Sequence, residues 1–181
     1  METLVKEKWV IDPSHTEIGF KIKHLMISNI KGTFNEFEAS IYTTGDNFMT
    51  AEVDCVINVA SVDTNDAERD KHLRSADFFD AERFPQISFV NNTVENVDKD
   101  GSYELWGDLT IKGIAKRIKL DVEFGGVVKD PWGNEKAIFT INGKVNRKDW
   151  GLNWNAVLET GGILVGEDVR ISCEVQLKRS A

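Results

Sequence analysis

The sequence has few of the residues that build disulfide frameworks, metal sites or rigid turns. It contains only 2 Cys, 3 His and 3 Pro among 181 residues. Cys55 and Cys173 allow at most one bridge, so a fold held together by several disulfides is excluded. The histidines, His15, His24 and His72, lack the short spacings of recognisable zinc sites. We therefore expect no metal and no cofactor.

Long apolar runs are also missing. The N-terminus, METLVKEKW, lacks the apolar stretch of roughly 7–15 residues that a signal peptide needs. No segment reaches the roughly 18 consecutive apolar residues of a membrane helix. We expect a cytoplasmic protein without stable membrane insertion, or a periplasmic one if a leader has been removed.

Positive charge is in the minority. Lys and Arg number 22 and Asp and Glu 30, which gives a formal net charge of -8. This balance disfavours nucleic acid and anionic membrane surfaces as main partners, because both attract clustered cations, although a local basic pocket remains compatible with it. With 41% hydrophobic and 29% charged residues, the chain is typical of one globular domain over residues 1–181.

The dominant pattern that is present has a period of two. Apolar and polar residues alternate over segments 16–25, 49–59, 102–112, 115–124, 136–148 and 165–177, which predicts strands with one buried face. Segments 9–11, 30–42 and 86–97 predict less regular strands. A change of phase between Phe34 and Phe37 predicts a bulge. Short turns rich in Gly, Asn and Asp favour antiparallel pairing.

Segment 64–84 breaks the alternation. Asn65 followed by Glu68 predicts a helix start and Pro85 a stop, so we expect one or two short helices at an end of the sheet. About eight one-faced strands can form a sandwich or a closed barrel. Closure leaves no unpaired edges and favours an all-β, extended eight-stranded antiparallel barrel. Such a barrel stands roughly 25–30 Å tall, which suits a long, thin apolar molecule.

Two cationic residues, His24 and Arg147, fall on the inward parity of their strands. A charged group on an apolar face needs a partner or an exit to water. They either hold a polar ligand head at the barrel mouth or pair with Asp or Glu as structural groups. On the predicted helix, Arg69 and His72 share a face and Asp70 points elsewhere. That pair either lines the ligand entrance or locks the helix onto the barrel.

The inward apolar residues either fill a core or form the wall of a ligand cavity. Those that we expect to contact a ligand are Phe20, Phe34, Phe37, Val53, Ile57, Phe78, Phe89, Leu109, Leu120, Phe139 and Ile171. The loop tryptophans Trp150 and Trp154 would be costly to expose without a partner. A homodimer through Trp132, Trp150 or Trp154 is a further expectation.

Several motifs, in this order, resemble the YceI-like family of bacterial lipocalin-like proteins that bind polyisoprenoids. The resemblance covers about residues 9–177, and Thr16 stands where the family often has Ser. The motifs are Trp9–Thr16, Phe20, His24–Leu25, Gly32–Phe34, Val62–Asn65, Arg69–Ser75, Asp77–Asp80, Phe84–Pro85, Gly107–Gly113, Arg147, Gly151 and Val165–Val169.

The resemblance implies a lipocalin-like barrel that binds a polyisoprenoid, an isoprenoid quinone or a fatty-acid derivative for transport, storage or sequestration. The family has no established general enzymatic activity, and no Gly-x-Ser-x-Gly elbow is present here. We therefore expect no enzyme, with His24, Arg147 or the Arg69–His72 pair orienting the ligand head. Two alternatives stay open: an enzyme that uses His72 or His24 as acid and base on a lipid, and a filled barrel that serves as an interaction module.

Overall fold

The computed structural model describes residues 5–25, 27–96, 101–156 and 164–180. These described residues form eleven strands, one α-helix and three short 3-10 helices. The strands are β1 (Lys6–Ile11), β2 (Glu17–His24), β3 (Ser28–Phe34), β4 (Phe37–Thr44), β5 (Asn47–Asn58), β6 (Val62–Asp63), β7 (Gln86–Asn96), β8 (Ser102–Ile111), β9 (Ile114–Lys129), β10 (Glu135–Asn146) and β11 (Val165–Arg179). The helices are η1 (Pro13–His15), η2 (Val59–Ser61), α1 (Ala67–Arg74) and η3 (Arg147–Trp150).

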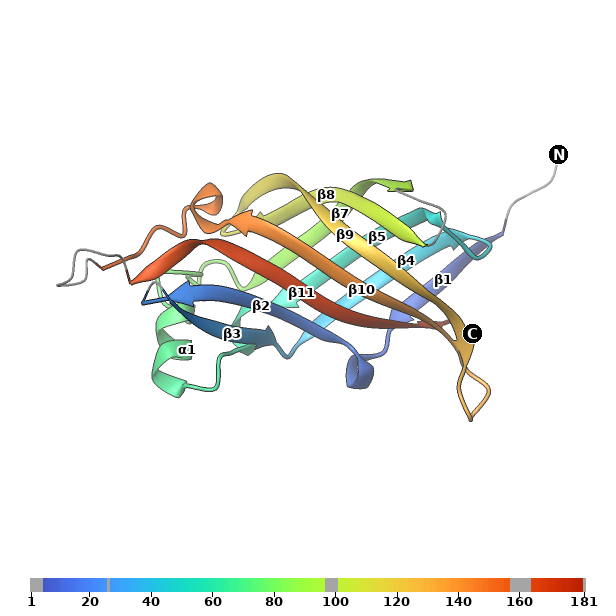
Figure 1. Ribbon diagram of the computed structural model, residues 1–181, viewed down its shortest axis with the longest axis horizontal. Helices are drawn as coiled ribbons and strands as arrows, with labels where there is room; N and C mark the ends of the chain where they lie inside the picture. The colour runs from blue at the N-terminus through green and yellow to red at the C-terminus, as the bar shows by residue number, and fades with distance from the viewer. Residues whose placement is uncertain (1–4, 26, 97–100, 157–163, 181) are drawn as a thin grey trace.

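The strands close into an antiparallel barrel. The order β1-β4-β5-β7-β8-β9-β10-β11 returns to β1, which pairs with β11. β11 pairs with β2 from Val165 to Glu174 and with β1 from Leu177 to Arg179. β1 and β2 therefore follow one another along the same position in the barrel wall, as do β4 and β3. The predicted eight-stranded lipocalin-like barrel is therefore confirmed. Figure 1 shows α1 and the β2–β3 hairpin at one end, and the start of β1 with the end of β11 at the other.

The phase change between Phe34 and Phe37 marks a break in the strand and not the predicted bulge. The chain leaves β3, which pairs with β2 and β6, and enters β4, which pairs with β1 and β5. Asn35 and Glu36 at the break bond to Ser61 and Asn58 through their backbones. The change of side-chain phase thus reflects a change of pairing partners.

The helical segment forms one helix where one or two were expected. Its N-cap is Asp66 and not the predicted Asn65: the Asp66 carboxylate accepts the N–H groups of Glu68 and Arg69, each at 3.1 Å. Asn65 lies just outside with φ of 64°. At Ser75 the backbone leaves the helical conformation, and the chain continues as turns toward β7. No helix of the described residues is long and apolar enough to cross a membrane.

An aromatic cluster fills the barrel near the end where β1 meets β11. Trp9 is 0% exposed, and its indole N–H donates to the Thr43 hydroxyl at 3.0 Å. The Trp9 ring lies 5.2 Å from that of Phe48, which lies 5.1 Å from Phe124 and 5.0 Å from Phe139. These rings narrow the barrel at this end, and Phe48 and Phe139 form part of the cavity wall there.

The tryptophans proposed for a homodimer differ in their exposure. Trp150 is 1% exposed and donates its indole N–H to the Leu109 carbonyl at 2.9 Å. Trp154 turns inward against His72 and Phe78. Trp132, on the β9–β10 turn, is 84% exposed. Any dimer contact through these residues therefore rests on Trp132.

Candidate functional site

A cavity of about 590 Å³ runs inside the barrel, lined by residues of β1–β5 and β7–β11. Its wall is almost entirely apolar, and its volume falls within the roughly 300–1,000 Å³ that small-molecule sites span. The presence of this cavity counts against a filled barrel that serves only as an interaction module.

All but one of the predicted ligand-contacting residues line this cavity. They are Phe20, His24, Phe34, Val53, Ile57, Arg69, His72, Phe78, Phe89, Leu109, Leu120, Phe139, Arg147 and Ile171. Phe37 does not: it packs against the core from the break between β3 and β4 and faces a small notch beside Thr16 and Asn35. That the lining residues touch a ligand stays a prediction.

Several residues that line the cavity are not predicted by the alternation of apolar and polar residues in the sequence. Phe48 faces the cavity together with Ala51, three residues later, so a strict period of two misses it. Trp154 and Leu164 lie in segments without periodicity, and Thr64 and Glu68 precede or begin the helix. The sequence shows that Trp154 is an aromatic residue of a loop, but only the folded chain shows that its ring turns inward.

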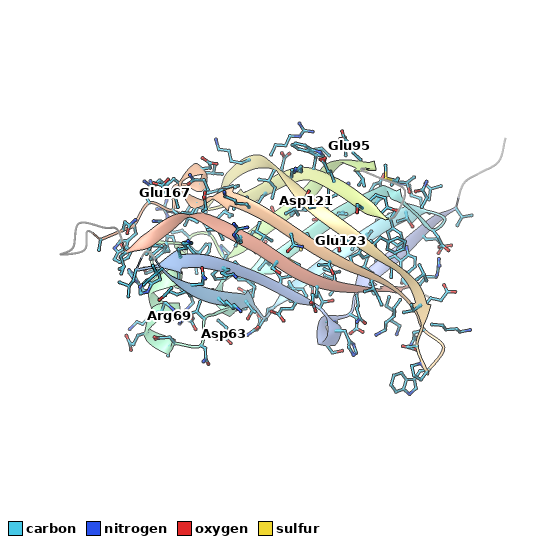
Figure 2. The ribbon with its side chains drawn as sticks, in the orientation of Figure 1. Asp63, Arg69, Glu95, Asp121, Glu123 and Glu167 are labelled. Carbon is cyan, nitrogen blue, oxygen red and sulfur yellow. The ribbon has the colours of Figure 1, made fainter. Side chains whose placement is uncertain are left out.

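The charged and imidazole side chains that line the cavity gather at the α1 end. Arg69 and His72 lie on α1, and the His72 ring meets the Trp154 ring at 4.6 Å. Arg147 bonds the carbonyls of Trp154 and Val165, and Val165 pairs with His24. Figure 2 shows Arg69 on α1 and Glu167 on β11 at this same end. This end is called the mouth below.

Arg147 is a structural group at the mouth. It is 3% exposed, and its guanidinium donates to the carbonyls of Gly166, Leu152, Trp154 and Val165. These bonds use four of the five N–H groups of the side chain. Burial lowers the pKa of Arg147. Its acceptors are backbone carbonyls, not the Asp or Glu that the sequence suggested, and they fasten the loop after η3 to β11.

Arg69 and Asp70 both hydrogen-bond to Thr64, which lies three residues before the first residue of the helix, Ala67. The Asp70 carboxylate accepts the Thr64 N–H at 2.8 Å and its hydroxyl at 2.5 Å. Arg69 donates to the Thr64 hydroxyl at 2.8 Å and to its carbonyl at 2.7 Å. Asp70 is only 8% exposed. This network favours the interpretation in which Arg69 locks the helix in place.

The two histidines of the mouth differ in their partners. His72 Nε2 lies 2.9 Å from an Asp77 carboxylate oxygen, and the ring stands edge-on to Trp154 and Phe78. His24 makes no side-chain hydrogen bond or ion pair with any residue that the structure describes. His24 is therefore the mouth residue whose ring nitrogens are most available to a ligand.

A Ser–His–Asp cluster at η1 is not a catalytic triad. Ser14 Oγ lies 3.1 Å and Asp12 Oδ2 2.9 Å from the same atom, His15 Nδ1. A triad needs the hydroxyl and the carboxylate on opposite ring nitrogens. Asp12 also pairs with Lys136, which holds the pKa of Asp12 well below its usual range. The cluster joins η1 to β10.

The two thiols belong to the apolar wall. Cys55 and Cys173 both line the cavity and are not bonded to each other. Burial raises the pKa of Cys55 to about 12 and that of Cys173 to about 11. Because the thiolate is the reactive form of cysteine, both thiols are poor nucleophiles at neutral pH.

Comparisons with known proteins agree with this architecture. Residues 9–177 match the YceI-like domain. A UPF0312 protein of Staphylococcus aureus is 36% identical over 173 residues, covering 95% of this chain and 98% of that protein.

Solved structures share the fold. The Campylobacter jejuni YCEI protein superposes with a TM-score of 0.76 at 35% identity, covering 100% of both chains. Burkholderia cenocepacia BcnA gives a TM-score of 0.77 at 22% identity over 92% of this chain and 98% of its own. A polyisoprenoid binding domain from Saccharophagus degradans gives 0.70 at 14% identity over 95% and 98%. The last two show the fold alone. From the domain match and the Staphylococcus relative, the chain belongs to the YceI-like family.

Proposed function

We propose that the chain binds a long-chain amphiphile, with the apolar tail inside the barrel and the polar group at the mouth. The observation that carries this proposal is the cavity itself: its wall is apolar, and its charged and imidazole side chains stand at one end. Burial contributes roughly 0.8 kcal/mol per CH₂, so a tail of many carbons binds tightly without other contacts.

The ligand classes that fit are a polyisoprenoid, an isoprenoid quinone and a fatty-acid derivative. Each has a long, thin apolar tail and a compact polar end. The naming of the Saccharophagus degradans domain as polyisoprenoid-binding supports the first class, because that domain has the same fold. Tight, reversible binding of such a tail would serve transport, storage or sequestration.

His24 is the residue that we expect to hold the polar end. A neutral imidazole donates one hydrogen bond and accepts another, so it suits a hydroxyl, an amide or a carbonyl. Arg147 already uses four of its five N–H groups on protein carbonyls. Arg69 uses two of its five on Thr64. Their role would be to keep the mouth in shape.

The His72–Asp77 pair at the mouth favours a second candidate, an enzyme that acts on the bound lipid. A carboxylate-paired imidazole is a common general base. This candidate predicts that the ligand is chemically changed on incubation and that His72→Ala stops the change while binding persists. Recovery of the ligand unchanged after long incubation would argue for binding alone.

A displacement titration tests the proposal. A fluorescent fatty acid that brightens in apolar surroundings is bound first and then displaced by an isoprenoid quinone. We expect saturable binding, and His24→Ala should weaken a ligand with a polar end by about fivefold, the worth of one hydrogen bond. His15→Ala is the matched control, since His15 lies at η1 and does not line the cavity. No saturable signal with either lipid would contradict the proposal.

A further inference from the structure

Four cationic side chains stand in register across four neighbouring strands. Lys144 on β10 lies opposite Arg170 on β11, Arg170 opposite Lys21 on β2, and Lys21 opposite Lys31 on β3. Lys23 continues the group along β2, two residues closer to the mouth. These five residues are called the basic face below.

The basic face points away from the cavity and is largely uncompensated. Its residues alternate with cavity-lining neighbours such as Ile22 and Val145. Lys144 pairs with Asp168 at 3.3 Å. Of the carboxylates in the described part of the chain, none forms an ion pair with any of the other four cations.

The arrangement is unfavourable for the sheet alone, because like charges directly opposite one another destabilise strand pairing. It is also unexpected in a chain of net charge -8. A row of like acidic charges lies on other strands: Glu95, Glu104 and Asp121 are opposite one another on β7, β8 and β9. On β11, Asp168 and Glu174 share the outward parity of Arg170. Figure 2 shows Glu95 and Asp121 on the side of the barrel away from β2 and β3. A row of four cations across neighbouring strands, of which only Lys144 has an ion pair among the described residues, points to an external anionic partner.

An apolar turn adjoins the basic face at the mouth. Leu25 and Ile27, between β2 and β3, are 46% and 86% exposed. The Leu25 N–H donates to the carbonyl of Leu164, which lines the cavity, at 2.8 Å. The turn therefore sits on the rim of the cavity, directly after His24 and two residues after Lys23. Exposed aliphatic side chains next to cations are the composition of a surface that lies in a lipid interface.

We propose that the basic face and the apolar turn dock the mouth of the barrel onto a membrane rich in anionic phospholipid. The cations contact lipid phosphates, while Leu25 and Ile27 enter the boundary between headgroups and acyl chains. The overall negative charge does not prevent this, since charges beyond about 8 Å are screened at physiological ionic strength. Docking itself needs no ligand. Docking would let a lipid pass between the bilayer and the cavity without crossing water. This benefit rests on the lipid-binding function proposed above.

Vesicle flotation tests the docking. The full-length chain is mixed with vesicles of phosphatidylcholine and phosphatidylglycerol in equal parts, or of phosphatidylcholine alone, at low and high salt. We expect binding to the anionic vesicles that high salt reverses. The triple variant Lys21→Gln, Lys23→Gln, Lys31→Gln should bind about 100-fold more weakly, at roughly fivefold per cation. Equal binding to both vesicle types would overturn the proposal.

Matched controls separate the basic face from net charge. Lys116→Gln, Lys129→Gln and Lys178→Gln remove the same three charges from exposed positions outside the basic face. This control triple should change binding by less than threefold. An equal loss in the two triples would overturn the proposal.

Single variants isolate the apolar turn. We expect Ile27→Ser to reduce flotation several-fold and Trp132→Ser, which removes an equally exposed apolar side chain at the β9–β10 turn, to leave it unchanged. Leu25→Asn also tests the turn without straining it, because Leu25 has φ of 55° and Asn tolerates that conformation. The reverse ranking of Ile27→Ser and Trp132→Ser would overturn the role of the turn.

Two further measurements keep the outcomes distinct. Light scattering without vesicles shows whether the basic face instead binds the acidic row of a second copy; a dimer lost in the basic-face triple would overturn the membrane assignment. The displacement titration, done without vesicles, reports on the cavity alone. A protein that binds and releases lipid normally in the titration but does not float with vesicles overturns the docking and leaves the proposed function standing. A protein that floats with anionic vesicles but gives no saturable lipid binding supports the docking and contradicts the proposed function.

Discussion

Filling the cavity from its own wall should abolish ligand binding without unfolding the protein. Ala39 lies on β4, faces the cavity and pairs with Cys55 on β5. Ala39→Phe would place a phenyl ring in the space that a ligand tail needs. Because the ring enters a hollow and not a packed region, we expect the free energy of unfolding to change by less than about 1 kcal/mol.

The size of the effect follows from the tail that the ring displaces. A phenyl ring excludes about six methylenes, which at roughly 0.8 kcal/mol each amounts to about 5 kcal/mol. A tail that shifts partly toward the mouth recovers some of this. We therefore expect Kd to rise between about 100-fold and 1,000-fold. The assay is the displacement titration, with urea denaturation to check folding.

The matched control for this variant is Glu38→Phe. Glu38 precedes Ala39 on the same strand and is exposed on the outer surface, so it carries the same ring away from the cavity. It should bind lipid like the wild type. A folded Ala39→Phe protein that binds within threefold of wild type would refute the reasoning that the tail occupies this part of the barrel.

Three further predictions concern stability. Arg147→Met should lower the free energy of unfolding by about 2–4 kcal/mol in urea, because it leaves buried carbonyls unpaired, whereas Lys148→Met on the exposed surface should cost little. Asp12→Asn should be less stable than wild type above about pH 5, and the two stabilities should converge at low pH. The reason is that the pKa of Asp12 is lowered in the folded protein, so as the pH falls the carboxylate is protonated in the unfolded chain first, and the stability that it contributes is lost. The raised pKa values of Cys55 and Cys173 predict the opposite slope: the unfolded thiols ionise from about pH 8.5 while the folded ones stay protonated, so stability falls with rising pH by up to about 1.4 kcal/mol per unit per thiol. The double Cys→Ala variant should flatten that slope, and an unchanged slope would contradict the burial of the thiols.

The sequence predicted the barrel well because alternation is a local property. Residues such as Phe20, Val53 and Leu120 face inward wherever their strands lie, so parity alone placed them on the cavity wall. The break at Asn35 was visible only as a change of phase. Whether a phase change marks a bulge or a change of pairing partners depends on strands elsewhere in the chain.

Other features depend on register and on loops, which the sequence does not specify. The sequence shows only that three cationic residues face outward on their strands, namely Lys21, Lys31 and Arg170. The lengths of the hairpins and the closure of the barrel then place them opposite one another. Trp154 turns inward against His72 and Phe78, and its carbonyl accepts a hydrogen bond from Arg147. These contacts join segments without periodicity. The side-chain partners that distinguish His24 from His72 are likewise set by tertiary packing.

Native mass spectrometry of the purified chain, before and after incubation with an isoprenoid quinone and a long-chain fatty amide, tests the central claim most directly. We expect one lipid bound per wild-type chain, recovered chemically intact on extraction. The Glu38→Phe variant should also bind one lipid, and the Ala39→Phe variant should bind none. A wild-type chain that emerges empty and takes up neither lipid would contradict it.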